Sequence, residues 1–348
     1  MPTLRLVASI VVLPVVIACS RGDQPSNSGT PSRVAKERAF TVAAETLWIR
    51  GSTEDDSLFV DPWYVAAGGG GVFVTDADRG LLALTPTGVP RDGADGLLHR
   101  GLLGPVAMLS DSTVVVVRRS DGALHLFDAS GRRHADVPAT EVPQAQGMCA
   151  LDEQRLLLSG GPRSLTIVDR RGGTPLPLPF PWRTLRDSST LLQQTAVASA
   201  FGRTGCVIAL MVGNEFALVF NEDSVRFHPF IESIDVPAVR HTVETAGDQI
   251  TTTSGFVARA STAEGVAMDD TLVLVAFGGA GARREGLIDL YDRGSGAYRA
   301  SVRLSVPIRA LAVGNEALYV LHAQSGLPAL LALRLVPGDS LSGSARTP

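Results

Sequence analysis

Seven basic side chains are the residues of this sequence best suited to holding an anion. They lie in short polar turns that follow apolar runs: Arg79, Arg118, Arg119, Arg163, Arg283, Arg284 and His322. A guanidinium group binds a carboxylate or phosphate through two parallel hydrogen bonds, so turns gathered on one face could hold a small anion or an acidic protein surface. The alternative is that these turns are simply solvated. Arginine is abundant here, because Lys36 is the single lysine among 31 Lys+Arg residues.

Other chemistries lack their motifs. The glycine clusters 68–71 and 278–281 are not followed by the Lys-Ser/Thr of a phosphate loop, and neither an HExxH nor a Gly-x-Ser-x-Gly pattern occurs. Residues 228, 232, 241 and 244 are two His and two Glu within one stretch, and they could converge on a metal or simply form a polar surface excursion. We therefore predict no catalytic residue, no metal ligand and no cofactor.

Two cysteines leave two possibilities open. Cys149 and Cys206 fall on strands that we expect in neighbouring parts of the fold, so they could pair in an oxidising compartment. We favour buried free thiols instead. Labelling of thiols under denaturing, non-reducing conditions distinguishes the two.

The elements that must position these residues repeat along the chain. Apolar runs begin at residues 72, 114, 156, 207, 272 and 318, with spacings of 42, 42, 51, 65 and 46 residues. A period near this length is typical of the four-stranded blades of a propeller. The run Val114–Val117 does not alternate with polar residues, so both of its faces must be buried, as in a strand between two packed blades.

Each run has similar neighbours. A strand precedes it, and a turn leads to a third strand that ends in an Asp and Gly turn, as in Leu124–Gly131 and Ile288–Gly294. A more polar fourth strand follows, such as Tyr298–Leu304. Only Leu185–Ala200 shows a modest helical pattern. We predict an all-β, six-bladed β-propeller of antiparallel blades over residues 39–337.

The sixth blade lacks a fourth strand near the C-terminus. An unassigned strand, Phe40–Ile49, lies at the other end of the domain. We predict that it completes the sixth blade and closes the ring, which removes an exposed sheet edge.

The N-terminal residues are typical of an export signal. Arg5 is followed by the apolar stretch Leu6–Ile17, which is too short to span a bilayer. The residues Val16-Ile17-Ala18-Cys19 resemble the lipobox of bacterial lipoproteins. This resemblance implies a signal peptide over 1–18, export, and a lipid on Cys19 that anchors the protein to the cell envelope. Ser20 points to the outer membrane where the organism has two membranes.

Polar, small residues follow the lipobox and also end the chain. We expect a flexible tether over 19–38 and a disordered tail over 338–348. The segments Asp61-Pro62-Trp63-Tyr64-Val65-Ala66 and Gly71-Val72-Phe73-Val74-Thr75-Asp76 resemble NHL-type repeats, and the chain as a whole resembles bacterial lipoproteins with a six-bladed NHL-type propeller.

These observations favour a binding or interaction module over an enzyme. We expect the partner to be a protein or a small anionic ligand and the protein to be a monomer. The net charge of −4 gives no preference for polyanions, and we expect no nucleic-acid partner. The alternative is a propeller-type hydrolase or lyase, similar to lactonases, with a site in the central channel.

Overall fold

The computed structural model describes residues 33–35, 37–91, 97–128, 130–137, 145–160, 164–172, 174–178, 195–199, 205–221, 224–234, 239–246, 249–256, 260–280, 286–322 and 327–338. Cys19, Arg163, Arg283 and Arg284 lie outside these residues. Within them, the one helix is the 3-10 turn η1 (Glu54–Asp56), and no helix is long and apolar enough to cross a membrane.

Six antiparallel sheets of four strands form the blades, and three two-stranded sheets lie outside them in the strand order. Blade one consists of β3 (Pro62–Gly68), β4 (Gly71–Asp76), β5 (Gly80–Leu84) and β6 (Leu97–Arg100). Blade two consists of β7 (Val106–Ser110), β8 (Thr113–Val117), β9 (Leu124–Asp128) and β10 (Arg133–Val137). Blade three consists of β11 (Ala145–Ala150), β12 (Arg155–Gly160), β13 (Ser164–Asp169) and β14 (Leu176–Leu178). Blade four consists of β15 (Thr195–Ser199), β16 (Cys206–Leu210), β17 (Glu215–Asn221) and β18 (Ser224–Pro229). Blade five consists of β23 (Gly265–Met268), β24 (Leu272–Phe277), β26 (Gly286–Asp292) and β27 (Tyr298–Leu304). Blade six consists of β28 (Ala310–Val313), β29 (Leu318–His322), β30 (Ala329–Pro337) and β2 (Val42–Arg50).

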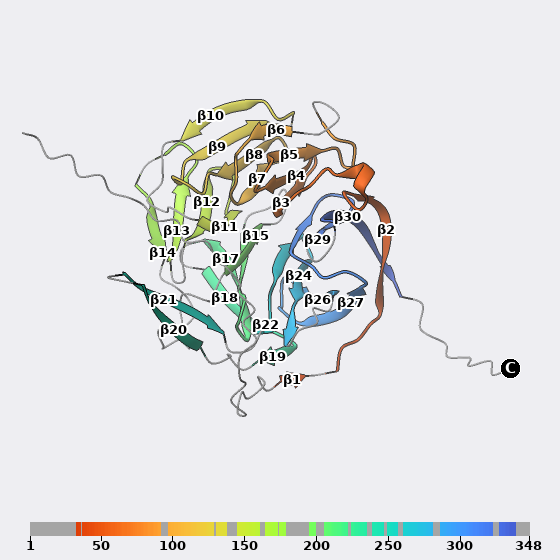
Figure 1. Ribbon diagram of the computed structural model, residues 1–348. Coiled ribbons are helices and arrows are strands. Elements are labelled where there is room, and N and C mark those ends of the chain that lie inside the picture. The colour runs from red at the N-terminus through yellow and green to blue at the C-terminus, as the bar shows by residue number, and fades with distance from the viewer. Residues whose placement is uncertain are drawn as a thin grey trace, which may run out of the picture.

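The blades form a closed ring (Figure 1). Their innermost strands are neighbours in the cyclic order β3, β7, β11, β15, β23, β28 and back to β3. The predicted six-bladed β-propeller is therefore confirmed. The helical expectation for Leu185–Ala200 is wrong over Thr195–Ser199, where the chain forms the innermost strand of blade four.

The hydrophobic core is divided among the six interfaces between blades. One apolar cluster fills each interface. In β8, Val115 and Val117 pack toward blade three, whereas Val114 and Val116 pack toward blade one. All four are fully buried, as the continuous apolar run predicts.

The N-terminal strand β2 completes blade six, as predicted. It pairs antiparallel with β30 from Val42 opposite Pro337 to Arg50 opposite Leu330, and Figure 1 shows the two strands side by side at the rim. The Nε1 atom of Trp48 donates to the carbonyl of Pro86, at 2.9 Å. The closing strand is thus also bonded to a turn of blade one.

Residues just before β2 also contact the propeller, within the stretch that the sequence assigns to a tether. Strand β1 (Arg33–Ala35) pairs with β19 (Glu232–Ile234). The Arg38 side chain is 7% exposed, donates to both carboxylate oxygens of Asp289 at 2.9 and 3.0 Å, and pairs with Glu232. Contact with the propeller therefore begins before residue 39, and Arg38 supplies the positive charge for two buried carboxylates.

The turns after the third strands follow the predicted chemistry, with one correction. In blade two, Asp128 accepts from the amides of Ser130 and Arg132, and Gly131 has a φ of 87°. In blade five, Gly296 rather than Gly294 has the positive φ, at 69°. The left-handed residue is therefore two positions beyond Gly294, because the turn Asp292–Ala297 of blade five is one residue longer than the turn Asp128–Arg132 of blade two.

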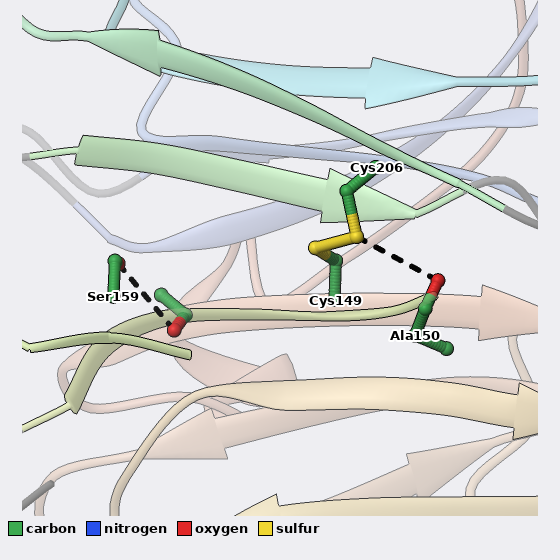
Figure 2. Close-up of a disulfide and its surroundings, with 5 residues drawn as sticks. Cys149, Ala150, Ser159 and Cys206 are labelled. Carbon is green, nitrogen blue, oxygen red and sulfur yellow. Dashed lines mark hydrogen bonds between the residues drawn. A yellow bond between two sulfur atoms is a disulfide. The ribbon is translucent and has the colours of Figure 1, made fainter. Parts of the chain in front are cut away.

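A disulfide joins Cys149 of β11 to Cys206 of β16, with Cα atoms 6.0 Å apart (Figure 2). The expectation of two free thiols is wrong, because the two side chains face each other across the interface between blades three and four. The sulfur of Cys206 also lies 3.6 Å from the carbonyl oxygen of Ala150. The bond covalently fastens two neighbouring blades.

Candidate ligand site at the central cavity

The turns between second and third strands lie beside the starts of the innermost strands. The amide of Val117, at the end of β8, donates to the carbonyl of Pro105, which directly precedes β7, at 3.0 Å. The amide of Arg119 donates to the carbonyl of Leu103, at 2.9 Å. Residues of these turns and residues that begin the innermost strands therefore share one face of the propeller.

A cavity of about 120 Å³ lies at this face, around the axis of the ring. Five of the six innermost strands contribute residues from or near their first positions, and blade four contributes Met211, which follows β16. The polar lining residues are Trp63, Tyr64, Gln146, Glu264 and Arg309. The apolar ones include Val106, Met148, Met211 and Val266. We call this space the central cavity.

Asp61, Trp63 and Arg309 hold one another in place at the wall of the cavity. The carboxylate of Asp61 accepts from Nε1 of Trp63 and from Nη1 of Arg309, both at 2.8 Å. The Arg309 guanidinium lies 4.1 Å from the centre of the Trp63 ring, within the range of a cation–π contact. These three contacts fix the indole and the guanidinium before any ligand arrives.

Arg119 flanks the same tryptophan from blade two. Its guanidinium lies 5.7 Å from the centre of the Trp63 ring. Among the described residues, the Arg119 side chain has no ion pair or hydrogen-bond partner. Trp63 is therefore bordered by two arginines, of which only Arg309 has a countercharge.

Tyr64 lies within electrostatic reach of both arginines. Burial raises the pKa of its phenol, while the positive charges of Arg119 and Arg309 partly oppose the rise. The hydroxyl therefore stays protonated at neutral pH and offers a hydrogen-bond donor next to the cavity.

Glu264 provides an acidic group on blade five, which neighbours blade six in the ring. Its carboxylate lies against blade five, so close to Gly278 that a Cβ atom there would stand 2.6 Å from Oε1. The charge around the cavity is thus divided, with arginines on blades six and two and the carboxylate on blade five.

The predicted basic residues have different surroundings. Arg79 donates to the carbonyl of Ser57 at 2.6 Å, and Nδ1 of His322 lies 2.9 Å from the carbonyl of Pro307. Arg118 pairs with Asp121, and this hydrogen bond lowers the pKa of Asp121 to about 2. None of these three lines the central cavity, and of the predicted residues Arg119 alone is described beside it.

Sequence reasoning missed Arg309, Trp63 and Glu264 as site residues. It considered the turns that follow the second strands, whereas the cavity is lined by residues at the starts of the first strands. A usable signal existed, since Trp63, Gln146, Glu264 and Arg309 are polar or amphipathic residues placed directly before apolar segments.

Of the possible metal set, the side chains of His228 and Glu232 are described, and those of His241 and Glu244 lie outside the described side chains. Glu232 pairs with Arg38, while the ring of His228 packs 5.4 Å from that of Phe216. Across the part of the chain that the structure describes, no three His, Cys, Asp or Glu side chains gather as metal ligands.

No protein-family model and no curated protein matches this chain. Solved structures similar to it include glutaminyl cyclase from Myxococcus xanthus (12% identity, TM-score 0.41, 87% of this chain and 100% of that one). They also include the propeller domain of Cps50 (Swd1) from Myceliophteria thermophila (11%, 0.45, 79% and 96%) and BamB from Moraxella catarrhalis (14%, 0.40, 88% and 97%). The fold defines the class, a six-bladed β-propeller, and likeness at these levels extends to nothing beyond the fold.

Proposed function

We propose that this protein is a lipid-anchored, extracytoplasmic β-propeller that binds an anionic ligand or the acidic surface of a protein at its central cavity. One observation carries the binding role: the guanidinium of Arg119, which has no ion-pair partner among the described residues, lies against Trp63, and Trp63 and Arg309 line the cavity. A concave, largely apolar site with a few convergent polar groups is the usual form of a ligand-binding site.

Two features support the envelope location. The Val16–Cys19 segment resembles a lipobox, and the Cys149–Cys206 disulfide is of the kind that persists in oxidising compartments outside the cytoplasm. Pairing of β1 with β19 begins at Arg33. The chain between Cys19 and that strand can then reach at most about 45 Å, which keeps the propeller near the membrane.

Replacing Cys19 tests the anchor. The full-length protein is expected to enter the detergent phase when membranes are solubilised and partitioned, whereas the Cys19→Ala protein should move to the aqueous phase. A Cys19→Ala protein that stays with the detergent would contradict lipid anchoring at this residue.

Photo-crosslinking in the intact envelope tests the binding role. A photo-reactive residue is placed in the cavity by Gln146→p-benzoylphenylalanine. As a control, another is placed at the exposed Val243 of strand β20 (Val239–Ala246) by Val243→p-benzoylphenylalanine. We expect a crosslinked adduct, detected by mass spectrometry, from residue 146 only. Adding Arg119→Gln should abolish it. Equal adducts from both positions, or none from the cavity, would contradict the proposal.

A further inference from the structure

We infer that the central cavity binds an organic monocarboxylate that carries one apolar side chain, as the C-terminal residue of a polypeptide does. The inference rests on the proposed function and narrows it to one ligand chemistry. It follows from the charge around the cavity, the size of the cavity and the apolar surface inside it.

The charges favour one negative charge on the ligand. Asp61 neutralises Arg309 through a 2.8 Å ion pair, so among the described residues Arg119 is the arginine beside Trp63 whose charge has no partner. A phosphate monoester carries nearly two charges at neutral pH, whereas a carboxylate carries one and matches the planar fork of arginine.

The size of the cavity sets the body of the ligand. Its volume of about 120 Å³ is well below the 300–1,000 Å³ typical of sites for whole cofactors or drug-sized molecules. Four water molecules occupy roughly that volume in the liquid, and so does one aliphatic side chain. The cavity therefore accepts a single side chain.

The lining sets the character of that side chain. Val106, Met148, Met211 and Val266 present apolar surface, and the thioether chains of methionine adapt to the shape of their contacts. Because Asp61 and Arg309 already hold Trp63, the carboxylate would meet a wall that does not need ordering, which reduces the entropic cost of binding.

Calorimetric titration of the full-length, detergent-solubilised protein tests the inference. The probes are N-acetyl-leucine, N-acetyl-Gly-Gly-Leu with a free carboxylate, the same tripeptide as its C-terminal amide, and inorganic phosphate. The two free carboxylates should bind, while the amide and phosphate should bind at least about tenfold more weakly, since a charge-assisted hydrogen bond contributes more than a factor of ten. Tighter binding of the tripeptide identifies a polypeptide C-terminus as the source, whereas equal binding identifies a small free acid.

Two neighbouring arginines supply a matched pair of variants. Arg119→Gln should weaken binding of the carboxylates about tenfold or more. Arg118→Gln should change it less than about twofold, because Arg118 is already paired with Asp121. If Arg119→Gln does not fold, Arg119→Lys replaces it, and the loss of the planar fork should still weaken binding.

Several results would overturn the inference. It fails if the amide binds as well as the acid, if phosphate binds more tightly, or if Arg118→Gln and Arg119→Gln weaken binding equally. Crosslinking from Gln146 without binding of either carboxylate would refute the ligand class and leave the proposed function standing. Absence of both would refute both.

Discussion

Asp76 is the residue that holds the cavity wall in place. Its fully buried carboxylate accepts four backbone N–H bonds: Val60 and Asp61 donate to Oδ2, and Asp78 and Arg79 donate to Oδ1. One side chain thus joins the loop that carries Asp61 and Trp63 to the turn after β4. Most aspartates in turns are exposed to solvent, whereas the Asp76 side chain is buried and bonds two segments of the chain.

Removing that acceptor should be costly. We expect Asp76→Ala to lower the free energy of unfolding by about 3 kcal/mol or more, because four buried or half-buried amides lose their partner. Asp78→Ala, in the same turn but exposed, should change it by less than about 0.5 kcal/mol. Chemical denaturation measures both, and equal effects would show that the bonds to Asp76 contribute little.

His125 should make stability depend on pH. The imidazole is 2% exposed, with Nδ1 2.9 Å from Oδ1 of Asp136 and near Arg133 of the same strand. Burial lowers the pKa of His125 below its ordinary 6.5, opposed by the hydrogen bond to Asp136. Other groups that face it include His99 of blade one and Arg118.

The sign follows from proton binding. Because the unfolded chain takes up the proton of His125 at a higher pH than the native protein does, the free energy of unfolding should fall as pH decreases below 6.5. The slope from this one group is at most about 1.4 kcal/mol per pH unit. Denaturation of the native protein and of His125→Leu between pH 5 and 7.5 measures it. The variant should have the shallower slope, and an unchanged slope would contradict the assignment.

At the scale of elements, side-chain direction decides what a strand contributes. Met148 and Ala150 of β11 pack toward blade two, whereas Cys149 between them faces blade four. On β16, Cys206 faces blade three, and a shift of one residue on either strand would turn a sulfur away. The spacing of Cys149 and Cys206 along the sequence does not show which way each side chain points. The sequence alone therefore leaves both a disulfide and two free thiols possible.

The disulfide should stabilise the interface between blades three and four. Its cysteines are 57 residues apart, and closing a loop of that length in the unfolded chain contributes about 4 kcal/mol. Cys149→Ala, Cys206→Ala and the double variant should therefore lose similar amounts in denaturant melts, since each removes the same bond. A double variant that loses twice as much as either single one would contradict this.

The same distinction explains what the sequence could predict. The second strands are buried on both faces, and this burial gives continuous apolar runs such as Val114–Val117. These runs are visible in the sequence, so the number and position of the blades could be predicted from it. The cavity is lined by single residues such as Trp63, Gln146, Glu264 and Arg309, which lie up to 246 positions apart in the numbering and share no local pattern. Only ring closure brings them together.

At the scale of the whole molecule, β2 makes the ring complete. Deleting residues 39–51 removes the outer strand of blade six and the Trp48 contacts to blade one. We expect that protein to lose cooperative thermal unfolding. Deleting 341–348, which leaves every β2–β30 pair, should not change it. Cooperative unfolding of the first variant would show that the ring is stable without this strand.

The closure also makes the fold dependent on the order of synthesis. Strand β2 is made before any complete blade, yet its partner β30 is made last. Strand β2 therefore stays unpaired until β30 has been made, and a chain that terminates before Ala329 cannot pair with it. Truncated copies would expose an open sheet edge to proteases and chaperones, so a protected edge in blade six depends on a chain that reaches β30.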